Sequence, residues 1–183
     1  MNDLPDVKLM ELAARGSETA FAAIVQRYQD VLLNFFLRSN VSFADGQDLA
    51  QRTFLRLWRY RRKYSAKGAK FTTFLFMLAR QESIDFFRAE SRRRVQEEAL
   101  MQAADGPVCA GACTAAAPAG ETVRRAMGRL TPLLREAVEL VVFQDMPYAE
   151  AGEVLGVPLG TVKSRVFNAL KRLKELMGNE CRH

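Results

Sequence analysis

The chain has 183 residues, 49% of them hydrophobic, so wholesale disorder is excluded and either one core or two small cores can form. Its 27 basic and 21 acidic side chains give a net charge of +6, which favours a polyanionic partner. An odd number of cysteines, with neither a signal peptide nor an apolar run of membrane-spanning length, indicates a cytoplasmic protein without membrane insertion.

The first half of the chain repeats its hydrophobic residues at helical spacing and lacks strand-like alternation, which predicts an all-α fold. A Gly-Ser pair divides the first run into two helices, and its serine, Ser17, can cap the second helix. The next helix is expected to begin near residues 42–45 and to bury Phe54, Leu57 and Trp58.

Positive charge is concentrated between residues 51 and 100, which carry thirteen basic and five acidic side chains. A basic loop at residues 61–70 precedes a helix at residues 71–87, and the continuation of that helix at residues 88–94 is strongly basic. Such clusters are expected where a protein grips phosphates, although two solvated helix faces would give the same pattern.

A change in composition divides the chain into two domains. Residues 96–120 are interpreted as a flexible linker, because the stretch from 103 to 120 is nearly all Ala, Gly, Pro and Cys and has little to bury. This interpretation predicts two small helical domains, at residues 1–95 and 121–183, joined by the linker.

The second domain contains a pattern typical of a helix-turn-helix. Residues 148–155 can form its first helix, in which Gly152 is the small residue that lets the second helix pack closely. Gly156 supplies the turn, and Thr161 lies near the start of the second helix. The side chains expected on the buried side of this second helix are Val162, Val166, Ala169, Leu170 and Leu173.

The outer side of the same helix is basic and polar, as a DNA-reading helix requires. Arg165 can donate to guanine, Asn168 can pair with adenine, and the lysines can contact phosphates. An ordinary helical hairpin with a basic face is the alternative. The residues predicted to bind DNA here are Thr161, Lys163, Ser164, Arg165, Asn168 and Lys171.

Several ordered segments resemble the motifs of the extracytoplasmic-function (ECF) sigma factors of the sigma-70 family. Residues 159–166 read LGTVKSRV and resemble the GTVKSRL signature of that family, while residues 129–136, RLTPLLRE, resemble its LPxxxRE helix start. In the first half, DLAQRTFLRLW at 48–58, FTTFLFMLAR at 71–80 and IDFFR at 84–88 also resemble family motifs. The chain departs from the family pattern at Arg52, Phe74, Gln81, Asn168 and Leu170.

The resemblance implies a transcription initiation factor whose partners are core RNA polymerase, promoter DNA and an anti-sigma factor. It assigns the promoter −35 element to the second domain, and the polymerase clamp and the −10 element to the first. The expected polymerase-binding residues are Asp48, Gln51, Arg52, Leu55 and Arg59. Those expected to bind −10 DNA are Lys67, Lys70, Arg80, Gln81, Ser83, Asp85 and Arg88, with Tyr64 and Phe71 as candidate aromatic partners for a base.

Three thiols and one imidazole form a candidate metal set that the resemblance does not explain. Cys109 and Cys113 lie four residues apart in the predicted linker, and Cys181 and His183 lie at the C-terminus. Such ligands can fill a tetrahedral zinc site or bind copper. Incidental cysteines, or a redox pair of Cys109 with Cys113, are the alternatives, and no other cofactor is expected.

The sequence argues against two other classes of function. A stand-alone helix-turn-helix regulator, with or without a metal response, needs only the second domain, so the clamp and melting motifs of the first domain argue against it. An enzyme is not expected, because His183 is the only histidine and no catalytic triad, phosphate-cradling glycine loop or paired catalytic carboxylates are found.

Overall fold

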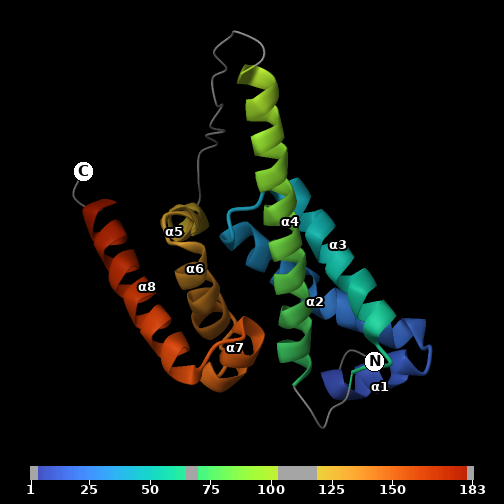
Figure 1. The fold of residues 1–183 in the computed structure, drawn as a ribbon. Coiled ribbons are helices and arrows are strands. Elements are labelled where there is room, and N and C mark those ends of the chain that lie inside the picture. Colours follow the sequence, from blue (N-terminus) through green and yellow to red (C-terminus); the bar gives the residue numbers. More distant parts are fainter. Residues whose placement is uncertain (1–3, 65–69, 103–118, 181–183) are drawn as a thin grey trace.

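The computed structural model describes residues 4–64, 70–102 and 119–180, and within these ranges it is helical without a strand. The all-α prediction is therefore confirmed. The first four helices group on one side of the molecule and the later ones on the other (Figure 1). The elements are α1 (Asp6–Ala14), α2 (Glu18–Arg38), α3 (Phe43–Tyr60), α4 (Phe71–Gln102), α5 (Ala119–Gly128), α6 (Pro132–Val138), the π-helix η1 (Glu139–Phe143), α7 (Tyr148–Leu155) and α8 (Leu159–Glu180).

Two serines begin the helices of the N-terminal unit as predicted. The Ser17 hydroxyl accepts a hydrogen bond from the Ala20 amide at 3.3 Å, and the Ser42 hydroxyl accepts one from the Asp45 amide at 3.2 Å. Each bond satisfies a backbone donor that has no partner within its own helix. The starts of α2 and α3 are thereby fixed.

The core of the N-terminal unit is aromatic and aliphatic, and Trp58 lies at its edge. Phe54 and Leu57 are buried as expected, but Trp58 is only half-buried, which corrects the prediction. Its ring packs on Phe21 with centroids 4.9 Å apart, and the Arg61 guanidinium lies 3.8 Å from its centroid. The cation thus shields the outer part of the indole that the core does not cover.

Helix α4 continues to Gln102, into the range predicted as linker, and α5 begins at Ala119. The segment 95–102 lacks Gly and Pro and is rich in strong helix formers, which accounts for the continuation. Residues 103–118, the densest part of the predicted linker, lie outside the described residues.

Arg135 holds together the turn between α5 and α6. Its guanidinium donates to the carbonyl oxygens of Met127, Gly128 and Leu130 at 2.9–3.0 Å, and to that of Ser39 at 2.9 Å. Burial lowers the pKa of this guanidinium from its ordinary value. The arginine therefore satisfies carbonyls at the end of α5 and also joins the C-terminal unit to the end of α2.

The two units pack against each other. Helix α7 lies on α4, α5 lies near α2, and one hydrophobic cluster includes buried side chains of both units. The flexible linker predicts units that polymerase and DNA place when they are bound, and that can pack differently in the free protein. In this structure the contact surface between the two units, called the seam, contains both hydrophobic side chains and ion pairs.

Candidate nucleic-acid interface

The helix-turn-helix is formed by α7 and α8 with a tight turn at Gly156. Gly156 adopts a left-handed conformation, with φ of 67°, which favours glycine. The Val157 amide donates to the Gly152 carbonyl at 3.1 Å. A Cβ added to Gly152 would lie 2.9 Å from the Val157 carbonyl oxygen, so no larger residue fits without movement. The predicted roles of both glycines are confirmed by this geometry.

Helix α8 buries one face against the C-terminal unit and exposes the other. Val162, Val166 and Ala169 are buried as expected, whereas Leu170 is 46% exposed and does not belong to the buried side. Among the residues predicted to bind DNA, Lys163, Ser164, Asn168 and Lys171 are exposed, and Thr161 and Arg165 are half-buried. The Ser164 hydroxyl donates to the Thr161 carbonyl at 3.0 Å, which leaves its oxygen as an acceptor.

Phe167 is the most exposed large hydrophobic residue of this helix, at 70%, and the sequence reasoning did not include it. It lies one turn after Lys163 and Ser164, on the outward side. The signal that could have identified it is an aromatic residue at a position where helical spacing predicts a polar one. An exposed aromatic ring on a reading helix can contact the methyl group of thymine.

The residues predicted to bind the −10 element occupy more than one face of α4. Arg80 pairs with Glu136 of α6 at 3.1 Å, and Lys70 pairs with Glu150 of α7 at 2.6 Å. Gln81 donates to Asp85 at 3.1 Å.

Ser83 is buried, at 5% exposure, so its hydroxyl is not available to DNA in this arrangement, whereas Arg88 is exposed. Lys67 lies outside the described residues.

Of the two candidate aromatic residues, Phe71 belongs to the core and Tyr64 packs against it. Phe71 is 3% exposed, and its ring meets Tyr28 and Tyr64 edge-on, with centroids 5.3 and 6.1 Å apart. The Tyr64 hydroxyl is buried without a hydrogen-bond partner. Burial is the first cause that raises the pKa of Tyr64. Phe71 is therefore not available to a base in this structure, contrary to the expectation, whereas Tyr64 is half-buried at the edge of the core.

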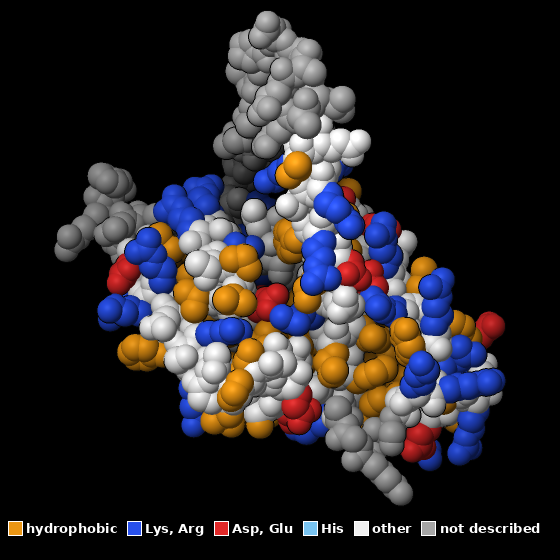
Figure 2. All heavy atoms as spheres, in the orientation of Figure 1, with side chains coloured by type: hydrophobic (Ala, Val, Ile, Leu, Met, Phe, Trp, Pro, Cys, Tyr) orange, Lys and Arg blue, Asp and Glu red, His pale blue; other side chains and the backbone are white. Residues whose placement is uncertain are grey.

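Cations remain abundant around these positions. Lys and Arg side chains follow α4 along the visible face, and a second group covers part of the C-terminal unit (Figure 2). On α3, Arg56 pairs with Glu82 of α4 at 2.7 Å and lies 3.7 Å from Asp85. The Glu82 hydrogen bond is the first cause that raises the pKa of Arg56. Part of the acidic charge on α4 is therefore balanced locally.

The predicted polymerase-binding residues share one exposed face of α3. Leu55 is 58% exposed, and Arg52 pairs with Asp48 one turn away at 2.6 Å. Gln51 and Arg59 are also exposed. An exposed leucine surrounded by charged side chains is compatible with a protein-docking surface.

The candidate metal ligands Cys109, Cys113, Cys181 and His183 lie outside the described residues. Over the part of the chain that the structure describes, no group of three or more His, Cys, Asp or Glu side chains could hold a metal ion. The described helices also include none that is long and apolar enough to cross a membrane.

Comparison with known families matches both units. The family "Sigma-70 region 2" matches residues 24–93, and "Sigma-70, region 4" matches residues 120–173, together more than half of the chain. The chain belongs to the ECF sigma factors of the sigma-70 family. As such, it is a transcription initiation factor that directs RNA polymerase to promoters.

Relatives match over most of this sigma factor. It is 28% identical over 160 residues to the ECF RNA polymerase sigma factor RpoE of Cereibacter sphaeroides, covering 87% of each chain. It is 27% identical over 180 residues to the ECF RNA polymerase sigma-E factor of Haemophilus influenzae, covering 93% of this chain and 94% of that one.

Solved structures have the same fold. RpoE of Bartonella quintana, determined with the anti-sigma factor NepR, matches with a TM-score of 0.67 and 26% identity, covering 86% of this chain and 96% of that one. CnrH, determined with the cytosolic domain of CnrY, matches with a TM-score of 0.71 and 22% identity, covering 95% and 97%.

Proposed function

We propose that this sigma factor reads its promoters through α8 at the −35 element and through α4 with the preceding basic loop at the −10 element. The observation that carries the proposal is the outward face of α8. There Lys163, Ser164, Asn168 and Lys171 are exposed on the second helix of a well-formed helix-turn-helix. Such a helix places cations near phosphates and amide or guanidinium donors near base edges.

The exposed face of α3, formed by Asp48, Gln51, Arg52, Leu55 and Arg59, is the proposed surface for core RNA polymerase. The proposed boundaries are a −10 and polymerase domain at residues 1–95, a linker at 96–120 and a −35 domain at 121–183. The chain would act by binding alone, without catalysis of its own, in the cytoplasm where polymerase and promoter DNA are found.

Run-off transcription with purified core polymerase on fragmented genomic DNA tests the proposal. We expect discrete start sites that depend on the added chain and share two sequence elements. A Leu55→Asp variant should lose polymerase binding while the helical circular dichroism signal is retained. Tight binding of the purified chain to duplex promoter without any polymerase complex would instead favour a stand-alone regulator.

We also propose an anti-sigma factor as a partner, supported by the likeness to RpoE of Bartonella quintana, which was determined with such a protein. Affinity purification of the tagged chain from its own cells, followed by mass spectrometry, tests this proposal. A co-purifying protein must suppress run-off transcription when it is added back, or it is not an anti-sigma factor.

A further inference from the structure

A cavity of about 370 Å³ lies where the end of α2, the middle of α4 and the start of α6 meet. Its volume falls in the range of small-molecule sites, roughly 300–1,000 Å³. Much of its wall is hydrophobic and is formed by Phe35, Ile84, Phe87 and Pro132. Phe87 is 42% exposed, so part of this hydrophobic surface is uncovered.

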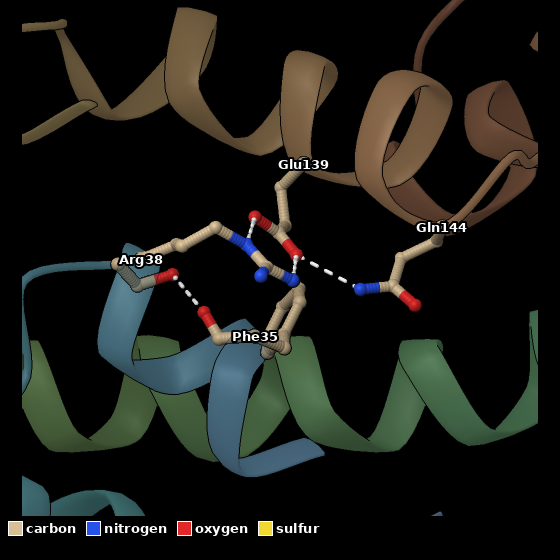
Figure 3. Close-up of polar contacts among 5 residues, drawn as sticks. Phe35, Arg38, Glu139 and Gln144 are labelled. Carbon is tan, nitrogen blue, oxygen red and sulfur yellow. Dashed lines mark hydrogen bonds and ion pairs between the residues drawn. The ribbon is translucent and has the colours of Figure 1, made fainter. Parts of the chain in front are cut away.

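The wall that α2 contributes is fixed by hydrogen bonds and an ion pair. The Ser39 hydroxyl donates to the Phe35 carbonyl at 3.1 Å, and Arg135 of α6 donates to the Ser39 carbonyl at 2.9 Å. Beside them the Arg38 guanidinium donates to both carboxylate oxygens of Glu139 at 2.6 Å, and the Glu139 side chain is only 1% exposed (Figure 3). The cavity is therefore already formed without a ligand.

Ser83 is the polar group of this cavity that lacks a partner. Arg80 pairs with Glu136 at 3.1 Å, and the Arg135 guanidinium is bonded to backbone carbonyl oxygens. Ser83 is 5% exposed, and its hydroxyl has no hydrogen-bond partner among the described residues. A buried hydroxyl in this state is unfavourable, so it needs an explanation, and a ligand that completes its hydrogen bonding is one.

Arg88 supplies an uncompensated positive charge to the same cavity. It is exposed, and no carboxylate of the described residues forms an ion pair with it. It lies five residues after Ser83, which is about 7.5 Å along the helix axis, so its long side chain can reach a group bound at Ser83. Because the lining holds three arginines and a single carboxylate, Glu136, the cavity favours an anion.

We propose that this cavity binds a small carboxylic acid with a hydrophobic body. Arg88 pairs with the carboxylate and the Ser83 hydroxyl donates to it, since a carboxylate accepts from both groups. The hydrophobic body covers Ile84, Phe87 and Pro132. The site goes beyond the proposed function and does not depend on it: Arg88 is also proposed to contact the −10 element, but the acid is recognised without DNA or polymerase.

Titration calorimetry of the full-length chain with straight-chain acids from hexanoate to decanoate tests the chemistry of the ligand. We expect saturable, one-to-one binding whose affinity rises by up to about fourfold for each added methylene group. Octan-1-ol has the same chain as octanoate without the charge, and it should bind about tenfold more weakly or worse. Equal affinities of octanol and octanoate, or no gain with chain length, would overturn the proposal.

Two arginine variants of α4 carry the same change in charge and test the anchor. Arg88→Gln removes the cation of the cavity, whereas Arg92→Gln removes an exposed arginine one turn further along that does not line it. Arg88→Gln should lose about tenfold or more in decanoate affinity while its affinity for octanol is unchanged. Arg92→Gln should bind decanoate as the unaltered chain does. Equal losses in both variants would overturn the site, because general positive charge would then explain the binding.

Ser83→Ala distinguishes a ligand-binding hydroxyl from a structural one. Because the hydroxyl has no partner, its removal should leave the Tm unchanged or raise it, yet should weaken decanoate binding severalfold. Saturating decanoate should raise the Tm of the unaltered chain, since it binds the folded state alone. A lower Tm with unchanged decanoate affinity would show that the hydroxyl is structural. If the unaltered chain binds no acid at millimolar concentration, the site is wrong even where run-off transcription succeeds.

Discussion

At the scale of single residues, α8 offers two different means of reading a base. Arg165 is half-buried at the flank of the outward face, so its long side chain must extend to reach a guanine edge. Phe167 is 70% exposed and has no donor, so any preference that it confers must come from apolar contact. The two side chains should therefore control different positions of the −35 element.

Arg165→Ala should cost about 1–3 kcal/mol of promoter binding and relax the preference at one −35 position, because one hydrogen-bonded base contact is lost. Lys171→Ala is the matched control, since loss of a phosphate contact should weaken all promoters evenly. Holoenzyme binding to a panel of −35 variants distinguishes the two effects. Unaltered promoter choice in Arg165→Ala would show that this arginine does not read a base.

Phe167 provides a sharper test, because its proposed contact is a single methyl group. Replacement of thymine by uracil in the −35 element removes only that methyl group, and should weaken binding by the unaltered protein at one or more positions. Phe167→Ala should weaken binding to thymine-containing DNA and abolish the difference between thymine and uracil. If the difference persists in the variant, another side chain contacts the methyl group.

At the scale of elements, the structure explains which features the sequence could predict. The serine caps of α2 and α3 and the bounds of α7 follow from local chemistry, and the structure confirms them. Leu170 was expected on the buried side because it is hydrophobic, but it lies beside the buried stripe of α8, which continues through Ala169 to Leu173. The carbonyl contacts of Arg135 depend on how the turn folds back, which residue spacing does not encode.

The close approach of α7 and α8 predicts opposite effects for two glycines. Gly152→Ala should destabilise the protein by about 1–3 kcal/mol, because the new Cβ would overlap the Val157 carbonyl oxygen at 2.9 Å. Gly160→Ala in α8 meets nothing within 4 Å, so it should be neutral or stabilise by up to about 1 kcal/mol. Urea unfolding of the two variants measures both changes. Equal free energies of unfolding for the two variants would show that the close contact between Gly152 and Val157 does not restrict the residue at position 152.

At the scale of the whole molecule, the packing of the units is the feature that sequence reasoning did not foresee. Arg38 and Glu139 are separated by 101 positions, and each alone looks like an ordinary charged residue at the end of a helical run. The Ala, Gly and Pro composition of the linker suggested independent units, but it carries no information about the surfaces that they present to each other. The sequence predicted the positive charge of the first domain, whereas the pairing of Arg38, Lys70 and Arg80 with carboxylates of the second domain required the structure.

The buried carboxylate makes this packing depend on pH. Burial raises the pKa of Glu139, while Arg38 of α2 and Gln144 oppose the shift, and the net direction is upward. In separated units the carboxyl would regain its ordinary pKa. Between the ordinary and the raised value the packed form holds a proton that the separated form lacks. By linkage, packing should strengthen as the pH falls through this window and weaken as the pH rises through it.

Spin-label distances between α3 and α8, measured from neutral to mildly acidic pH, test this dependence. As the pH falls, the distances in the unaltered chain should shift toward those of the packed form. The part of this shift that comes from Glu139 should be absent in Glu139→Gln, because the amide does not titrate. The informative quantity is the difference between the two proteins, and identical pH profiles would rule out Glu139 as the titrating group.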